Sequence, residues 1–379
     1  MGCHAGVRAT NLVDCRTEAP IEAFQGSATE LERSALDDLA RFLASVFGGE
    51  SQVLQNWFAH WWALNPTWNT SIPRGWLVRS DKKAIIAFTA NIPFKYVIDG
   101  KPALCCATGS TAVDPHFRGA GLAKTVGLKF LSQSQGDLLV GTDSTRVAAG
   151  LWHSLGMKSL DARWLRSNYR VLAHGRSLVE GHSMPEDSSR LVGRIAGTSL
   201  GFALDTIAFV TRRPKTLSVE RVDGFSAFDA DSLDACRASH ATTYAYRDVP
   251  TLNWLYFGTP NVKQTRAVLV ARSGNRLVGY LAMKQWAGNS YYLLECRCRD
   301  ADQEIAAELL WAARDFAQQN HARSIVVRPY TPMIEAAVPA MLSISLKKPT
   351  TTYSYLLKSG EMNLENWEAG PGDGDVGVN

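Results

Sequence analysis

The sequence VDPHFRGAGLAKTVGLKFL, at residues 113–131, contains the most informative pattern in this chain of 379 residues. An apolar, β-branched run ends at its start, Gly119 and Gly121 follow two residues apart, and apolar side chains then recur at helical spacing. This order predicts a strand, a tight turn and a helix. Glycines let backbone amides approach a ligand, and a helix N-terminus favours an anion. The stretch therefore predicts a phosphate site.

The spacing of the glycines excludes two common phosphate-binding motifs. A P-loop needs Gly, four residues and then Gly-Lys-Ser/Thr, and a dinucleotide fingerprint needs a small residue where Lys124 stands. The pattern Arg118-x-x-Gly121-x-Ala123 instead resembles the Arg/Gln-x-x-Gly-x-Gly/Ala signature of the GNAT superfamily of acyl-CoA-dependent N-acetyltransferases. In that family this loop wraps the pyrophosphate of coenzyme A.

The resemblance implies an acyl-CoA site whose residues can be named. In the family, the pantetheine arm contacts the strand before the loop and enters between two parallel strands that splay apart. The pantetheine contact therefore falls on Val113. Acetyl-CoA or another acyl-CoA is expected as the cosubstrate, and no metal is expected. The pyrophosphate contacts fall on Arg118, Gly119, Ala120, Gly121, Leu122 and Ala123.

A second match to the family follows this stretch. Residues 137–141 predict a strand and residues 145–155 a helix, which completes a right-handed βαβ unit. Residues 145–157, TRVAAGLWHSLGM, are similar to the family's Asn-x-x-Ala-x-x-Leu-Tyr helix and the Gly-Phe after it. Thr145 replaces the asparagine, and Trp152 replaces the tyrosine that serves as general acid. Because an indole cannot usefully donate a proton near neutral pH, that role does not carry over.

Few residues are candidates for the acid and the base. Asp143 and His153 come from the next strand and helix, although an aspartate just past a strand is more often a helix cap and Asp143-Ser144-Thr145 fits that role. Glu295 lies between apolar residues of a later strand, and burial in a cleft would raise its pKa toward that of a general base. A salt bridge with Arg297 is the alternative for Glu295. The strand before the loop offers hydroxyls but no carboxylate: Thr108, Ser110 and Thr111.

The segments before the loop predict helices and then an antiparallel meander. A cap-like Ser27-x-x-Glu30 begins one helix, and a second helical stretch carries Trp57 and Trp61. In the family, helices at this place border the acceptor site, so both tryptophans are candidates for a substrate pocket. Core packing is the alternative. Four strands follow, with an Asp-Gly hairpin turn before the last: residues 75–80, 83–91, 93–98 and 103–113.

The second half of the chain repeats the order of the first. Residues 164–171 predict a strand that closes the first half, and a helical region, a meander, a helix and a strand follow from residue 215. The glycine turn is replaced by RDADQEI at residues 299–305, so no second pyrophosphate site is expected. The predicted fold class is α/β, with two GNAT-like domains. Each is a mixed antiparallel/parallel twisted sheet flanked by helices, and the second is degenerate.

The predicted boundaries divide the chain into five segments. The apolar stretch at residues 191–211 is interrupted by Arg194 and Asp205, which favours a buried inter-domain helix over membrane contact. The segments are a partly ordered start at 1–26, a GNAT domain at 27–172, a linker with the apolar helix at 173–214, the second domain at 215–358, and an acidic, glycine-rich tail at 359–379.

Composition limits the partners and the compartment. The net charge of +4 comes from 40 basic and 36 acidic residues, and this small imbalance does not call for a nucleic acid or a membrane. The seven cysteines are odd in number and lack metal-ligand spacing, and no basic and apolar leader is present. These features predict a cytoplasmic protein.

The sequence therefore predicts an N-acyltransferase of the EC 2.3.1 type. It would transfer an acetyl or other acyl group from acyl-CoA to a small-molecule or peptide amine by direct attack in a ternary complex. One alternative is a non-catalytic acyl-CoA binding or sensing protein, which Trp152 favours. Another is an aminoacyl-tRNA-dependent peptide-bridge transferase, against which the near-neutral charge and the intact coenzyme A motif argue.

Overall fold

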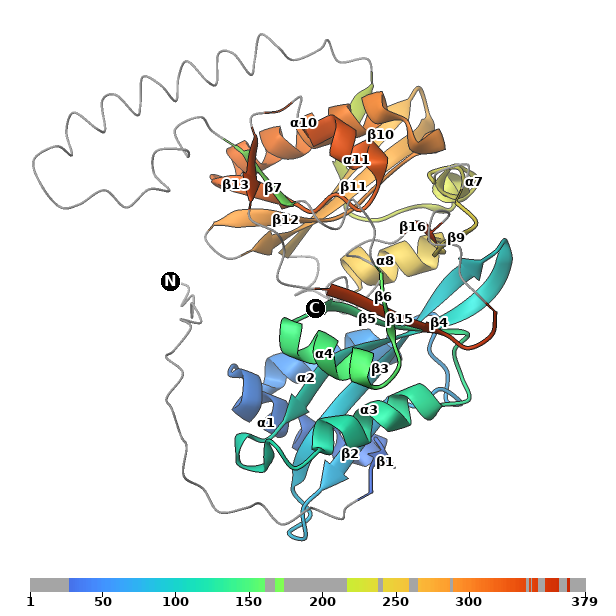
Figure 1. Ribbon diagram of the computed structural model, residues 1–379. Helices are drawn as coiled ribbons and strands as arrows, with labels where there is room; N and C mark the ends of the chain where they lie inside the picture. The colour runs from blue at the N-terminus through green and yellow to red at the C-terminus, as the bar shows by residue number, and fades with distance from the viewer. Residues whose placement is uncertain are drawn as a thin grey trace, which may run out of the picture.

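Two sheets, each with helices packed against it, make up the computed structural model (Figure 1). No helix among the described residues has the length and apolarity needed to cross a membrane. The predicted N-terminal segment, the apolar stretch at residues 191–211 and most of the tail lie outside the described part. The structure describes residues 27–160, 168–173, 217–237, 241–258, 265–286, 289–338, 341, 343–346, 352–360 and 367–368.

The first sheet has nine strands within the described residues. Its order is β1-β2-β3-β4-β5-β15-β6, and β9 pairs with both β3 and β16. The β4–β5 pair at its centre is parallel, whereas β3–β4 and β15–β5 are antiparallel. The strands are β1 (Thr29–Glu30), β2 (Gly75–Arg79), β3 (Ile85–Ile98), β4 (Lys101–Val113), β5 (Leu138–Ser144), β6 (Lys158–Ser159), β9 (Thr243–Ala245), β15 (Thr352–Leu357) and β16 (Trp367–Glu368).

Helices cover both faces of this sheet. Successive strand residues point to opposite faces, so Cys105 and Leu138 join one core while Cys106 and Leu139 join another. The first core includes side chains of α1, α2 and η2, and the second includes those of α3 and α4. Where β4 and β5 pair, residues 103–107 and 138–141 form apolar runs because helices cover both faces of the sheet there. The helices are α1 (Leu36–Phe47), α2 (Ser51–Phe58), the π-helix η2 (Ala59–Ala63), α3 (Leu122–Ser132) and α4 (Arg146–Ser154).

The second sheet has seven strands in the described residues, in the order β14-β7-β13-β12-β11-β10-β8. The long helix α10 (Gln303–Gln319) packs on it through residues such as Leu309 and Ala313. Three shorter helices are α7 (Ala230–Asp234), α8 (Val249–Phe257) and α11 (Pro332–Ala337). The strands are β7 (Asn168–Leu172), β8 (Ser218–Val222), β10 (Arg266–Ser273), β11 (Arg276–Trp286), β12 (Ser290–Cys298), β13 (Ser324–Val327) and β14 (Ser343–Leu346).

The two sheets exchange strands. β7 follows the first half in sequence but lies between β13 and β14 of the second sheet. In return, β15 from the end of the chain lies between β5 and β6 of the first sheet (Figure 1). The expectation that the strand near residues 164–171 closes the first half is therefore wrong. The prediction of two mixed sheets flanked by helices is confirmed, whereas the residue boundaries of the domains stay predictions.

Candidate functional site

The loop between β4 and α3 has open space beside its two glycines. Asp114 caps the short 3-10 helix η3 (Pro115–Phe117) by accepting from the His116 amide at 2.9 Å. Gly119 and Gly121 then adopt left-handed backbone angles, with φ of 90° and 79°. A Cβ built on either glycine would meet no atom within 4 Å. Gly121 is also the N-cap of α3 and leaves the first amides of that helix without a side-chain cap. This geometry fits a phosphate group.

The corresponding place in the second half is closed to an anion. Asp302 caps α10, and its carboxylate accepts from the amides of Glu304 at 2.7 Å and Ile305 at 3.3 Å. A phosphate here would meet a carboxylate that already occupies the helix N-terminus. The difference between α3 and α10 supports the expectation that only the first half holds a pyrophosphate.

β4, the strand before this loop, stops pairing with its neighbour β5 before the loop begins. β4 and β5 pair in parallel from Cys105–Leu138 to Thr108–Gly141, and no later pair joins them, although both strands continue. A β-bulge interrupts β4 at the same level, where Ser110 has a φ of 47°. The backbone groups of β4 that face β5 beyond Thr108 are therefore open to an extended ligand. The end of the pairing is consistent with the splay that the family resemblance implies.

Three threonine hydroxyls meet at the bulge. The Thr89 hydroxyl lies 2.8 Å from those of Thr108 and Thr111, and all three side chains are buried or half-buried. Thr108 and Thr111 were candidates from the sequence, but Thr89 comes from β3 and was missed. The bulge that brings it opposite the other two leaves no signal in a single sequence.

Comparison with known proteins identifies the fold. Neither the protein-family models nor the curated proteins include a match to the sequence. Among solved structures, the GCN5-related N-acetyltransferases of Anabaena variabilis and Kribbella flavida match over 88% of this chain and 73% and 72% of theirs. The Anabaena variabilis protein is 10% identical to this chain at a TM-score of 0.54, and the Kribbella flavida protein is 15% identical at a TM-score of 0.51. The chain has the GNAT-superfamily fold. The match to N-myristoyltransferase of Saccharomyces cerevisiae with bound myristoyl-CoA covers 96% of this chain and 87% of the myristoyltransferase chain. The identity is 12% and the TM-score is 0.55.

Trp152, which stands where the family resemblance puts a tyrosine, is buried between α4, α3 and β5. Its side chain is 2% exposed, and its ring lies 5.8 Å from that of Phe130. A Cβ built on Gly141 would lie 3.4 Å from the indole nitrogen of Trp152, and one built on Gly127 would lie 3.2 Å from its ring. Glycine at these two positions therefore lets α4 approach β5 and α3 closely.

The other two candidates near the splay have different surroundings. His153 is exposed, and its Nε2 lies 2.7 Å from the Ser159 hydroxyl. Asp143 lies in β5, and its side chain is outside the described part of the structure. The helix cap of α4 is Thr145, which accepts from the Ala148 amide at 3.3 Å, so the cap assigned to Asp143 was wrong.

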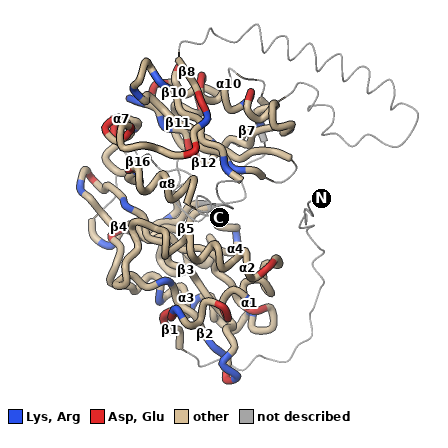
Figure 2. The backbone as a smooth tube through the Cα atoms, turned by 180° about the vertical axis from the view of Figure 1, so that it is seen from behind, with Lys and Arg blue, Asp and Glu red and all other residues tan. Residues whose placement is uncertain are grey.

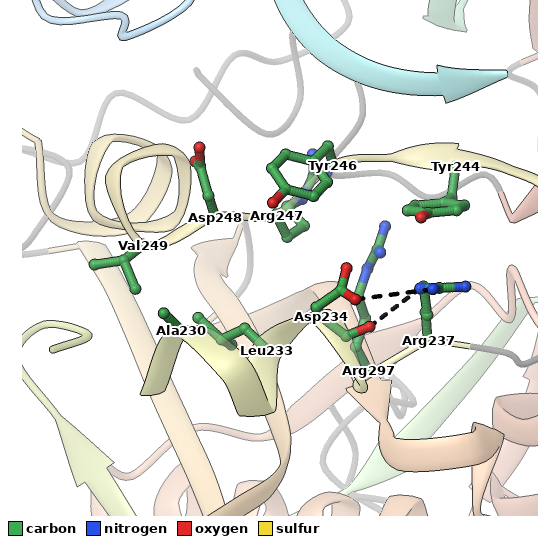
Figure 3. A pocket seen from close by; sticks show the side chains of 10 residues that line it. All are labelled: Ala230, Leu233, Asp234, Arg237, Tyr244, Tyr246, Arg247, Asp248, Val249 and Arg297. Carbon is green, nitrogen blue, oxygen red and sulfur yellow. Dashed lines mark hydrogen bonds and ion pairs between the residues drawn. The ribbon is translucent and has the colours of Figure 1, made fainter. Parts of the chain in front are cut away.

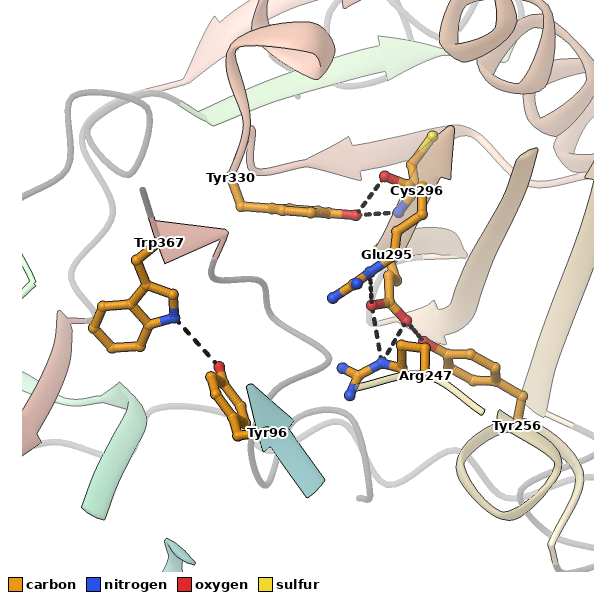
Figure 4. Close-up of polar contacts among 8 residues, drawn as sticks. Tyr96, Arg247, Tyr256, Glu295, Cys296, Tyr330 and Trp367 are labelled. Carbon is orange, nitrogen blue, oxygen red and sulfur yellow. Dashed lines mark hydrogen bonds and ion pairs between the residues drawn. The ribbon is translucent and has the colours of Figure 1, made fainter. Parts of the chain in front are cut away.

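Glu295 lies in a buried ion cluster of the second sheet (Figure 4). Its carboxylate accepts from Arg297 Nε at 2.7 Å, Arg247 Nε at 3.0 Å and the Tyr256 hydroxyl at 2.5 Å. Burial alone raises the pKa of Glu295, but the two arginines outweigh it and lower that pKa to about 2. The expected raised pKa is wrong, and the salt bridge to Arg297 is confirmed. Arg247 was missed because it lies 48 residues away in sequence.

The tryptophans of the second helix take part in the core. Trp61 is fully buried, with its ring 5.6 Å from that of Trp62 in an edge-to-face arrangement. Trp57 is half-buried, with its ring 6.4 Å from that of Trp61. Core packing, the alternative given above, is what the structure shows for Trp61. Trp57 stays a pocket candidate.

A small pocket lies away from the loop and the splay. It has a volume of about 70 Å³, and Arg237, Arg247 and Arg297 line it together with two tyrosines (Figure 3). β9, which contributes to it, pairs with Tyr96 and Val97 near the end of β3. The splay adjoins the opposite end of β3, so this pocket is separate from the candidate coenzyme site.

His60, in the π-helix η2, is a buried histidine whose ring makes no hydrogen bond to a described residue. It is 1% exposed, and neither ring nitrogen has a partner among the described residues. Its ring lies 5.3 Å from that of Trp254 on α8, and Gly258 leaves room for it. Burial, reinforced by the positive charge of Arg266, lowers the pKa of His60 to about 3.

We therefore expect the stability of the protein to fall in mild acid. His60 is neutral when folded, and its pKa rises from about 3 to 6.5 on unfolding, so its contribution is complete above pH 6.5 and is lost as the pH falls toward 3. The loss at pH 5 amounts to about 2 kcal/mol. Urea unfolding at pH 7.5 and pH 5 measures it. His60→Phe should flatten this pH dependence, whereas His153→Gln, at an exposed histidine, should keep it. Equal slopes in both variants would contradict the assignment.

Proposed function

We propose that this protein is an acyl-CoA-dependent N-acyltransferase whose first half binds the cosubstrate. The observation that carries the proposal is the continuity of the loop and the splay. The uncapped N-terminus of α3 follows directly from β4, the strand that parts from β5. A ligand with an anionic end and an extended arm fits both. The S. cerevisiae neighbour with bound myristoyl-CoA supports an acyl-CoA in this role.

Residue roles follow from this placement. The amides from Gly119 to Ala123, with Arg118, would hold the pyrophosphate, and Val113 at the end of β4 would contact the pantetheine arm. The amine would attack the thioester carbonyl directly, because the thioester is already activated and the main task is alignment. Asp143 and His153 stay proposed for proton transfer. Glu295 is not proposed as the base, because its two arginine partners lower its pKa to about 2 and make it a weak proton acceptor.

A protein that binds acyl-CoA without catalysis is the second candidate. The observation that favours it is Trp152, which is buried where a proton-donating tyrosine would stand. No nucleic acid is proposed as a partner. Along the described backbone, acidic and basic residues alternate in both halves of the chain and are not separated by sign (Figure 2). A cytoplasmic location stays a prediction of the sequence.

Two measurements test the proposal. Calorimetry should show binding of acetyl-CoA or myristoyl-CoA by the intact chain, and the comparison of the two identifies the preferred acyl length. Release of free thiol across a panel of small amines, amino sugars and peptides should then exceed the rate without acceptor. Absence of binding contradicts the proposal. Binding without turnover on any acceptor would favour the non-catalytic candidate.

A further inference from the structure

The exchanged strand β15 brings Ser354 to the point where β4 and β5 part. Ser354 is paired with Gly141 across the β15–β5 ladder, and Gly141 is paired with Thr108 in the last β4–β5 pair. Thr108, Gly141 and Ser354 therefore form one row across three neighbouring strands. Because pantetheine can pass between β4 and β5 only as far as they are unpaired, the sulfur end of an inserted arm lies at this row.

Ser354 points to the face of the sheet that carries α3 and α4. Leu356, two residues further along β15, packs against the core of that face, whereas Tyr355 packs on the other side with its ring 5.4 Å from that of Trp367. Side chains two apart on a strand share a face, and so do residues directly paired between strands. Ser354 and Gly141 thus share the face on which Trp152 covers Gly141.

The hydroxyl of Ser354 has no partner. The residue is 1% exposed, and its Oγ makes no hydrogen bond to any residue that the structure describes. A buried hydroxyl without a partner is unfavourable, and such groups in native proteins call for an explanation such as a missing ligand. Gly141, which has no side chain, separates Ser354 from Thr108. The donor is therefore held beside the place reached by the sulfur.

We propose that the Ser354 hydroxyl donates a hydrogen bond to the sulfur of the bound acyl-CoA. The inference rests on the proposed function and gives the site a hydrogen-bond donor from β15. When the amine attacks, the N–C bond forms and the C–S bond breaks, with its electron pair going to sulfur. The O–H of Ser354 stabilises the resulting thiolate, and its own proton stays on oxygen. The proton lost by the amine finally reaches the sulfur through solvent, so amide and free thiol are the only products.

Calorimetry with coenzyme A and desulfo-coenzyme A tests this contact without turnover. At about pH 9, where the thiol ionises, wild type should bind coenzyme A more tightly than the desulfo analogue, by about tenfold. Ser354→Ala should erase this preference and leave binding of the desulfo analogue unchanged. The Tm of Ser354→Ala should not fall, because the variant loses a hydroxyl that has no partner.

Ser324→Ala is the matched control. Ser324 is also a 1% exposed serine in a strand, but its hydroxyl lies 3.0 Å from that of Ser290. Its replacement should lower the Tm and leave the preference for coenzyme A intact. If wild type and Ser354→Ala show the same preference for coenzyme A over the desulfo analogue, the Ser354 contact is wrong but the proposed function stands. A loss of Tm in Ser354→Ala as large as that in Ser324→Ala would also contradict the contact. Failure of wild type to bind either ligand overturns the proposed function as well.

Discussion

Gly121→Glu is expected to weaken coenzyme A binding by at least about 100-fold, which is about 2.7 kcal/mol. The new side chain would enter the open space that the proposal assigns to the pyrophosphate, because a Cβ there meets no atom within 4 Å. It would place a carboxylate at the N-terminus of α3, where a second anion is then repelled. Calorimetry with coenzyme A measures the loss.

Gly100→Glu provides the control for backbone strain. Gly100 lies in the turn between β3 and β4, has a φ of 76° against 79° for Gly121, and is equally open. Both variants force a side chain into a left-handed conformation, so both should lose similar stability. Gly100→Glu should nevertheless bind coenzyme A like wild type. A similar loss of affinity in both variants would contradict a pyrophosphate site at Gly121.

Glu295→Ala is expected to destabilise the protein by about 3–5 kcal/mol. The substitution removes the carboxylate that Arg247 and Arg297 share, and these side chains are 2% and 5% exposed. Two positive charges would remain buried side by side, which is far more costly than losing a surface pair. Denaturant unfolding of the variant and wild type at pH 7 measures the difference.

The control for this prediction is Glu220→Ala. Glu220 is 56% exposed and pairs with Arg272 at 3.1 Å, so its loss should change stability by less than about 1 kcal/mol. If Glu295→Ala were as stable as Glu220→Ala but lost turnover on an accepted amine, Glu295 would be a catalytic group and not a structural one.

The coenzyme loop could be predicted from the sequence because its determinants are local. The left-handed glycines, the uncapped helix start and the strand before them all lie within residues 113–131, so one short pattern specifies the backbone. The side-chain cap of α10 can be predicted from the sequence in the same way, since Asp302 stands directly before that helix. Local backbone chemistry is the part of structure that a single sequence records most directly.

Pairings between distant residues could not be predicted. The pKa of Glu295 depends on Arg247, which reaches it from the segment before α8. The Thr89 contact depends on a bulge between two strands, and the position of Ser354 depends on a strand exchange. A partial signal exists for Ser354, because residues 352–357 read TYSYLL and place this serine between two tyrosines. That signal identifies an unusual strand position but not the neighbouring strand.

The position of β15 also determines when the proposed coenzyme site can be completed during synthesis. Residues 138–144 leave the ribosome early, but their outer neighbour at residues 352–357 emerges only after the whole second sheet has been translated. The N-terminal half therefore cannot finish folding as a unit ahead of the rest, as sequential domains commonly do. A ribosome-bound chain that lacks β15 has an open edge at β5. Coenzyme binding would thus report that nearly all of the polypeptide has been made.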